Sequence, residues 1–262
     1  GRDWWIAMSK HNTDSILLCL FTSQGVNFHS WQKLNMPKAW YTSSQLAFSK
    51  DGSQFYYPLF DSATVNSFVA IANFDRCSGL FTNCIVQQIT TNSLLWGLSC
   101  SNTNDLLYTC SSNSVYQINT TTFTVDTLAT YDGFISPPGQ TCCATSFWNM
   151  YLAANGKIYI TSGSGVQHLH EMNYPDSAGV ACDVQQHAIS LGYAQLRAVP
   201  NHPNYNLGPV IGSVCDTLSV GLAEPAHDFR FSISPNPVSD GVVKLTYLLP
   251  QNKAGVLEVF DL

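Results

Sequence analysis

Short apolar stretches alternate with small polar turns along most of this 262-residue chain. The apolar stretches run for about four to eight residues and are rich in Val, Ile, Phe and Tyr, whereas Asn, Asp, Gly and Ser fill the intervals between them. A helical period is almost absent. Because β-branched and aromatic residues favour strands and small polar residues favour turns, the pattern predicts an all-β protein.

One unit of strand, turn, strand, loop and strand recurs within this pattern. The turns at its centre lie near positions 51, 104 and 155, about fifty residues apart, which is the spacing of four-stranded propeller blades. A single blade cannot bury both faces of its sheet, so consecutive blades must stack around an axis. We therefore predict a β-propeller with about four to five visible blades and further blades missing on the N-terminal side; a β-sandwich with irregular hairpins is the alternative. The repeated units are 46–75, 98–130 and 151–173, and residues 3–21 fit a fourth, shorter copy.

The pattern changes near the C-terminal end and divides the chain into three parts. Residues 1–217 hold the propeller repeats, and 218–228 reads as a linker because Gly, Pro and charged residues interrupt the alternation. Residues 229–262 begin a second, small β-domain, which we expect to be incomplete because three strands leave one edge unpaired. Its predicted strands are Phe229–Ile233, Val242–Leu248 and Gly255–Leu262.

Composition narrows the class of protein. Only 11% of residues are charged while 45% are apolar and 12% aromatic, so the surface must consist largely of uncharged polar residues, as is typical of extracellular β-proteins. The net charge of -6 gives no basic footprint for nucleic acid or an anionic membrane surface. The longest apolar run, residues 15–21, is far too short for a transmembrane segment. The start lacks an initiator Met and a signal peptide, so we expect a mature chain or one whose front is missing.

Nine cysteines in such a chain favour an oxidising compartment. No CxxC pair is present, which argues against a structural zinc site. The spacing suggests that Cys77 pairs with Cys84 across a short loop. Two further pairs are predicted from position alone. Three cysteines then remain, so at least one thiol is free or forms a disulfide with another chain. The guessed pairs are Cys100 with Cys110 and Cys182 with Cys215; the remaining cysteines are Cys19, Cys142 and Cys143.

The final 34 residues carry a family resemblance. A Pro-Asn-Pro entry, a following strand, a Leu-Pro turn and a closing Val-Phe-Asp-Leu strand closely resemble the start of the type A C-terminal sorting domain, of immunoglobulin-like fold, found on cargo of the bacterial type IX secretion system. Family members continue for several more strands. The matching residues are Pro235, Asn236 and Pro237 at the entry, Val242–Leu248, Leu249 and Pro250, and Phe260, Asp261 and Leu262 at the end.

The preceding region resembles the propeller-type repeat proteins, YVTN-like or WD-repeat-like, that often carry this domain. The matching stretches are "LAFSKDGSQF" at 46–55 and "LAANGKIYI" at 152–160, which are blade turns and strands in that family. The resemblance implies export across two membranes by the type IX machinery, followed by attachment to the outer cell surface or release. The resemblance does not imply a catalytic activity.

A short triplet of Asp, then Ser or Thr, then a small or aliphatic residue occurs five times. It resembles the O-glycosylation site of bacteria with this secretion system. Ordinary turn formation by Asp-Ser and Asp-Thr is the alternative. The hydroxyl residues of the five triplets are Ser15, Ser62, Thr127, Ser177 and Thr217.

No catalytic constellation is evident. His168 and His170 could share a metal ion because they lie two residues apart on one strand face, but a third ligand would have to come from His187 or His202, at no recognisable spacing. Nucleophile-elbow, P-loop and dinucleotide motifs are absent from the sequence. The adjacent Cys142 and Cys143 could form a reactive thiol site, although a structural role fits their surroundings better.

Binding fits the sequence better than catalysis does. A propeller places its variable loops around a rigid hub. Four tryptophans lie near strand starts, where they could stack on sugars or fill the space between blades. We therefore predict a secreted or cell-surface protein that binds a glycan or protein ligand and needs no cofactor; a secreted hydrolase with its catalytic residues in the missing blades is the alternative. The tryptophans are Trp4, Trp5, Trp96 and Trp148.

Overall fold

The computed structural model of the chain forms two compact units, Gly1–Ser213 and Val214–Leu262. Between residues 3 and 195 it describes 3–37, 44–137 and 142–195. Beyond residue 195 it describes 197, 199, 207, 208, 210, 212, 213, 215, 230–234, 242 and 244–248. These described residues are almost entirely strands and turns, with one short 3-10 turn, η1, at Gly179–Cys182.

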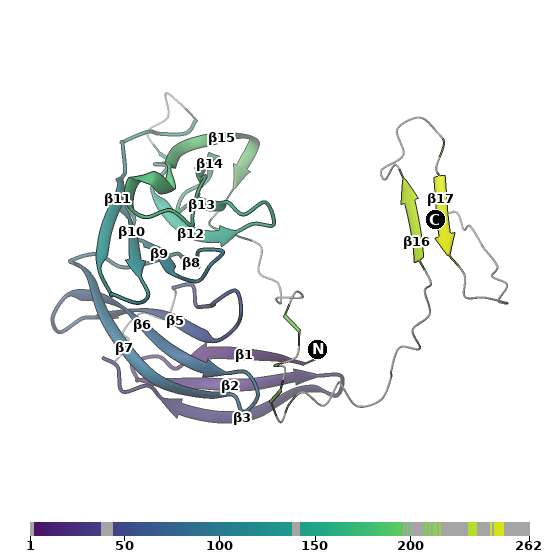
Figure 1. The fold of residues 1–262 in the computed structure, drawn as a ribbon. Helices are drawn as coiled ribbons and strands as arrows, with labels where there is room; N and C mark the ends of the chain where they lie inside the picture. The colour runs from purple at the N-terminus through teal and green to yellow at the C-terminus, as the bar shows by residue number, and fades with distance from the viewer. Residues whose placement is uncertain are drawn as a thin grey trace. The chain divides into compact units, whose positions relative to one another are not determined.

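The described residues of the first unit form four antiparallel sheets that follow one another in chain order (Figure 1). Three of them have four strands and one has three, and neighbouring strands in a sheet are also neighbours in sequence. This is the arrangement of consecutive propeller blades, so the predicted all-β propeller class is confirmed. The sheets are β1 (Trp4–Ser9), β2 (Ser15–Thr22) and β3 (Gly25–Lys33); β4 (Ala47–Phe48), β5 (Gln54–Asp61), β6 (Asn66–Asp75) and β7 (Leu80–Thr91); β8 (Leu98–Cys100), β9 (Leu106–Cys110), β10 (Ser114–Asn119) and β11 (Val125–Thr130); and β12 (Phe147–Leu152), β13 (Ile158–Ser162), β14 (Val166–Met172) and β15 (Val184–Gln195).

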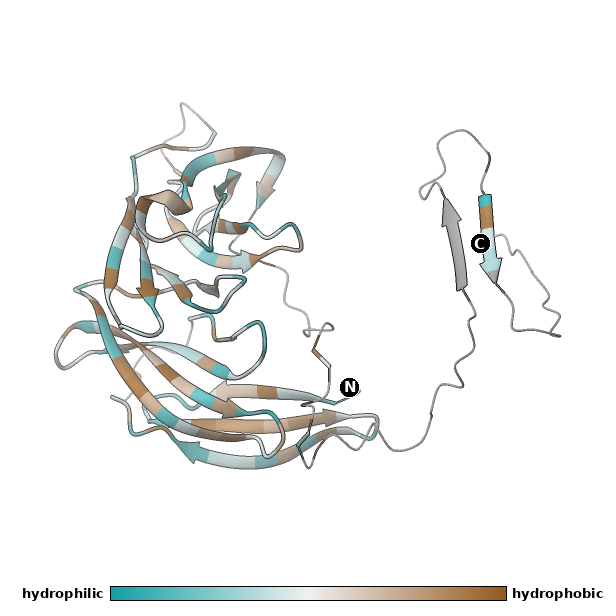
Figure 2. Cartoon of the chain, in the orientation of Figure 1, coloured by the Kyte–Doolittle hydropathy of each residue, from teal (hydrophilic) through white to brown (hydrophobic). Residues whose placement is uncertain are grey.

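Three hydrophobic cores lie between successive sheets, so the two middle sheets are buried on both faces. Along β5, Phe55 and Tyr57 face the core shared with the first sheet, whereas Tyr56 faces the core shared with the third sheet. Strand side chains alternate between faces, so burial on both sides requires an uninterrupted apolar run. This is why β9 is buried along its whole length, and why hydrophobic residues concentrate on the strands (Figure 2). A two-layer sandwich, the alternative prediction, is wrong.

The repeated turns have a local chemical cause. At the first, the Asp51 carboxylate accepts hydrogen bonds from the Ser49 hydroxyl (2.6 Å) and the Ser53 amide (3.0 Å), while Gly52 takes a φ of 72° that a side chain rarely allows. The same place in the next two blades is taken by Asn104, with φ 67°, and by Gly156, with φ 79°. These turns join the first and second strands of their sheets.

Equivalent turns in adjacent blades are also tied to one another. The Lys50 amide donates to Asn104 Oδ1 (2.8 Å), and the Asn102 side-chain amide donates to the Gly156 carbonyl (3.1 Å). Asp176 adds a further link, because its Oδ1 accepts the Asn102 backbone N–H at 2.6 Å. Polar turn residues therefore hold one end of successive blades together while the apolar cores fill the space between the sheets.

The predicted disulfide pairs are wrong. Five thiols are free, and adjacent Cys142 and Cys143 are joined to each other instead. Cys77 and Cys215 each take part in a disulfide. The free cysteines are Cys19, Cys84, Cys100, Cys110 and Cys182.

Strand alternation explains why one guessed pair cannot form. Cys100 on β8 packs into the core between the second and third sheets, whereas Cys110 on β9 packs into the core between the third and fourth. They therefore lie on opposite faces of one sheet. Burial raises the pKa of Cys100 to about 11 and that of Cys110 to about 12, and buried thiols of this kind behave as small apolar side chains.

In the second unit, the described residues form one antiparallel pair, β16 (Arg230–Ser234) with β17 (Lys244–Leu248), in the register Arg230 opposite Leu248. These strands overlap the first two strands predicted for this region. The third predicted strand and the motif residues Pro235, Asn236, Pro237, Phe260, Asp261 and Leu262 lie outside the described residues, as does the predicted linker. In the described part of the chain, no helix is long and apolar enough to cross a membrane.

Candidate ligand-binding face

The starts of the first strands of three sheets, β4, β8 and β12, lie close together. Gln45 precedes β4, Trp96 precedes β8, and Trp148 lies near the start of β12. The Gln45 backbone N–H donates to the Trp96 carbonyl (2.9 Å), and its side-chain amide donates to the Met150 carbonyl (2.8 Å) and accepts from the Met150 N–H (3.1 Å). We call Gln45, Trp96, Trp148 and Arg197 the hub cluster.

Trp96 and Trp148 form a parallel stack at the centre of the hub cluster, with ring centroids 3.9 Å apart and planes 15° apart. The Trp96 indole N–H donates to the Ser112 hydroxyl at 3.0 Å, which fixes the ring orientation. Both indoles are half-buried. The close approach depends on a residue without a side chain at position 97, because a Cβ there would lie 2.2 Å from the Trp148 carbonyl oxygen. The stack is therefore rigid and still partly open to solvent.

Arg197 completes the hub cluster and is exposed, yet it is held from several directions. Its guanidinium carbon lies 4.4 Å from the centroid of the Trp148 ring, and its Nε donates to the Gly163 carbonyl at 2.9 Å. Its backbone carbonyl accepts from the Asn149 side-chain amide (2.9 Å) and the Thr161 hydroxyl (3.1 Å).

This anchoring is costly for an exposed residue. The Arg197 φ of 49° is left-handed, which costs a non-glycine residue about 1–2 kcal/mol. Fixing the long side chain costs up to about 2 kcal/mol of rotamer entropy. Hydrogen bonds worth about 1 kcal/mol each and the cation–π contact offset these terms. The result is a guanidinium whose position is set before any ligand arrives.

A second polar group lies on the fourth sheet, between the segment before β12 and the strands β14 and β15. Ser136 Oγ lies 2.7 Å from His168 Nδ1, and His187 Nε2 lies 2.9 Å from Asp132 Oδ2. Phe134 stacks on His187 with centroids 4.1 Å apart. Burial alone would raise the pKa of Asp132, but hydrogen bonds from the Phe134 N–H and from His187 hold it below the ordinary carboxyl value.

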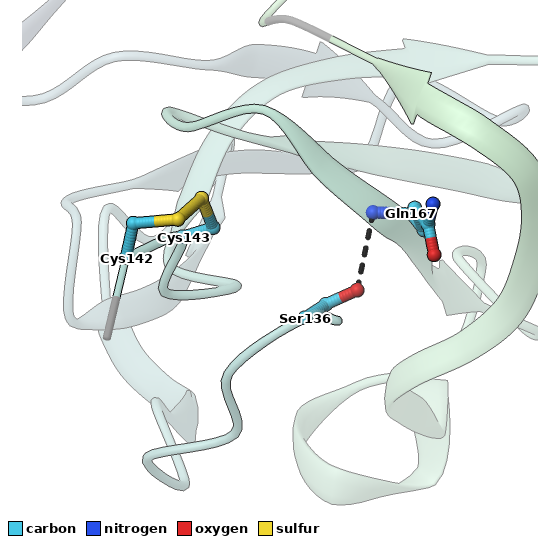
Figure 3. The surroundings of a disulfide bond; sticks show 4 residues. All are labelled: Ser136, Cys142, Cys143 and Gln167. Carbon is cyan, nitrogen blue, oxygen red and sulfur yellow. Dashed lines mark hydrogen bonds between the residues drawn. A yellow bond between two sulfur atoms is a disulfide. The ribbon is translucent and has the colours of Figure 1, made fainter. Parts of the chain in front are cut away.

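The Ser136–His168 pair has a positioning role in this arrangement. Ser136 is fully buried, and its hydroxyl oxygen also accepts the Gln167 N–H at 3.1 Å (Figure 3). A nucleophilic hydroxyl needs access to a substrate, which this one lacks. The pair ties the segment before β12 to strand β14.

His170, the other histidine singled out by its spacing, is 1% exposed and occupied on both ring nitrogens. Its Nδ1 accepts the His187 N–H at 3.0 Å, and its Nε2 lies 3.4 Å from the Ser162 hydroxyl. Burial lowers its pKa to about 4, against a partial opposing effect of a hydrogen bond to the Thr145 backbone. In the described ranges, no three His, Cys, Asp or Glu side chains gather as a ligand set for a metal ion.

The bonded pair Cys142–Cys143 lies beside these residues (Figure 3). Cys142 is exposed, and Cys143 takes a left-handed φ of 80°. The Cys143 carbonyl accepts the Ser136 N–H at 3.1 Å, and the neighbouring residues Ile135 and Ala144 form an isolated antiparallel bridge. The disulfide therefore lies next to the short antiparallel bridge that holds Ser136 in place.

The four tryptophans named from the sequence divide into two groups. Trp5 belongs to the core between the first two sheets, where its indole N–H donates to the Arg76 carbonyl at 2.8 Å, and Trp4 stacks on Phe21. Trp96 and Trp148 form the open stack of the hub cluster. Gln45 and Arg197 carry no sequence signal that would have found them, because their roles depend on contacts between blades.

The predicted glycosylation positions occupy varied sites. Thr127 is exposed on strand β11, and Ser15, Ser62 and Ser177 are half-buried. Three of the aspartates beside them take part in local or inter-blade hydrogen bonds: Asp14 with Ser15, Asp61 with Ala63 and Thr64, and Asp176 with Asn102. Thr217 and His202 lie outside the described residues.

No protein-family model and no curated protein matches the chain. Among solved structures, a protein from Lactobacillus plantarum is similar with a TM-score of 0.48 and 11% identity over 72% of this chain and 57% of the other. An auxiliary nutrient binding protein from Bacteroides thetaiotaomicron has a TM-score of 0.43 and 12% identity over 74% and 46%. A putative 6-phosphogluconolactonase from Bacteroides uniformis has a TM-score of 0.43 and 14% identity over 72% and 52%. The chain spans about half the length of each of these proteins.

Proposed function

We propose that this chain is a secreted, cell-surface binding protein whose ligand site is the hub cluster. The observation that carries the proposal is the half-buried Trp96–Trp148 stack with Arg197 held beside it, at the ends of strands from different blades. Aromatic rings on a rigid support contribute large contact area at low entropy cost on binding. The role is extracellular recognition or adhesion of a glycan or a protein.

Catalysis has less support. Two serine–histidine pairs lie at hydrogen-bond distance in and beside the fourth sheet, Ser136 with His168 and Ser162 with His170, and both serines are fully buried. The neighbouring Asp132 is bonded to a different histidine, His187. The described residues of this chain therefore offer no accessible serine with a histidine base beside it. The hydrolase alternative would have to rely on residues elsewhere.

A binding screen tests the proposed site. The intact protein is labelled and applied to a glycan array and to extracellular proteins, in parallel with Trp96→Ala and with Trp31→Ala, an exposed tryptophan on β3 that serves as the matched control. Loss of an aromatic anchor at the centre of a site costs about tenfold or more in affinity. We expect Trp96→Ala to lose binding and Trp31→Ala to retain it. Absence of any ligand, or equal losses in both variants, would refute the site.

We propose export by the type IX secretion system through the region that resembles the sorting domain. The resemblance of residues 229–262 supports this route, and the paired strands β16 and β17 overlap the first two strands predicted for this region. The wild-type gene and a version lacking the codons for residues 229–262 are compared in a bacterium that has the system. We expect the shortened protein to accumulate in the periplasm. Equal surface display of both would rule the route out.

A further inference from the structure

Among the described residues, the Arg197 guanidinium uses only a small part of its hydrogen-bonding capacity. A guanidinium has five N–H donors, and the bond to the Gly163 carbonyl uses only the one on Nε. The described residues contain two ion pairs, Lys157–Glu171 and His187–Asp132, and neither involves Arg197. Arg197 is thus an exposed cation that is fixed in place and has no carboxylate partner among the described residues, in a chain whose net charge is -6.

The position of this charge relates it to the aromatic stack. The guanidinium lies over Trp148, and Trp148 stacks on Trp96, so the cation and both indoles form one continuous stack. A planar, pre-positioned guanidinium matches the two oxygens of an anionic group in a fixed fork geometry. A single guanidinium suits one anionic group on a ligand whose remaining surface is uncharged, and it does not provide the basic stripe that a nucleic acid needs.

We infer that the hub cluster binds an acidic glycan, with Arg197 receiving the anionic group of one sugar and the tryptophan stack contacting the sugar rings. This inference rests on the proposed binding function and names its ligand class. The anionic group is a carboxylate, as in a uronic acid, or a sulfate ester; both present oxygens that suit the guanidinium fork.

Four polymers test the inference on the intact chain. Polygalacturonate, its methyl ester, dextran sulfate and unmodified dextran are titrated by calorimetry at constant ionic strength. We expect polygalacturonate or dextran sulfate to bind, and the matching uncharged polymer to bind at least about tenfold more weakly, because a hydrogen bond to a charged group is lost. Comparing the two charged polymers identifies the anionic group.

Variants locate the contact. Arg197→Gln removes the charge and should weaken binding of the charged polymer by about tenfold, with Arg197→Lys in between because it keeps the charge and loses the fork. Lys33→Gln, an exposed residue at the end of β3, removes the same charge elsewhere and should leave binding unchanged. Near-ultraviolet circular dichroism verifies that each variant is folded. The comparison of charged with uncharged polymers uses the unmodified protein, so it tests the inference even if a variant does not fold.

The outcomes separate the inference from the proposed function. If the protein binds the uncharged polymers as well as the charged ones, or if Lys33→Gln weakens binding as much as Arg197→Gln does, the inference is overturned while a binding function stands. If the chain binds no glycan and no protein in the screen described above, the proposed function itself fails. Binding of a charged polymer that depends on Arg197 alone supports both.

Discussion

His170 should make the stability of the propeller unit depend on pH. The side chain is buried against Phe147, with ring centroids 4.7 Å apart, and burial lowers its pKa to about 4 from an ordinary value of 6.5. A histidine with a lowered folded-state pKa binds a proton more readily when the chain unfolds. Its contribution to stability is therefore complete above pH 6.5 and is lost as the pH falls towards 4.

The size of the effect follows from the two pKa values. Between pH 7.5 and pH 5 the free energy of unfolding should fall by about 2 kcal/mol, and the full loss below pH 4 would be roughly 3 kcal/mol. Measurement stops at pH 5 because the carboxylates with lowered pKa values remain ionised there. These carboxylates are Asp51, Asp75, Asp132 and Asp183.

Urea unfolding followed by tryptophan fluorescence at the two pH values measures the difference. In His170→Asn the amide oxygen can still accept the His187 N–H, but the side chain no longer titrates, so the pH-dependent loss should shrink by about 2 kcal/mol. Phe147→Leu weakens the same core without removing a titrating group and should keep the wild-type difference. An unchanged pH dependence in His170→Asn would show that His170 is not held neutral by burial.

Two further substitutions test local features of the hub and its neighbouring segment. Gly97→Ala should destabilise the fold by about 1–3 kcal/mol because the added Cβ meets the Trp148 carbonyl, whereas at Gly192 an added Cβ meets nothing within 4 Å; similar thermal unfolding midpoints for the two alanine variants would contradict the close approach. Replacing Cys142 and Cys143 by Ser should change the free energy of unfolding by only about 1 kcal/mol, since the closed ring spans two residues. Hydrogen exchange of the Ser136 amide, which donates to the Cys143 carbonyl, should nevertheless become faster. An unchanged exchange rate measured by NMR would show that the disulfide does not hold Ser136 in place.

The amino-acid sequence alone determined the strands, the turns between them and their repetition. The Asp51–Gly52 turn and its counterparts at Asn104 and Gly156 depend on side chains and backbone angles within a few residues, so their spacing could be read directly. The repeat of about fifty residues indicated sheets that must stack on one another. Blade-like sheets follow from these local features because sheets that are stacked one after another cover each other's faces.

Only the tertiary structure decided which distant residues meet. Cys100 and Cys110 are close in sequence, but strand alternation sends them into different cores, while the Cys142–Cys143 bond forms between neighbours that the spacing left unpaired. The hub cluster likewise joins residues from the starts of separate strands and from the chain after β15. Such contacts depend on how one sheet is placed against the next, and this placement is set by packing over the whole interface and not by any short stretch of sequence.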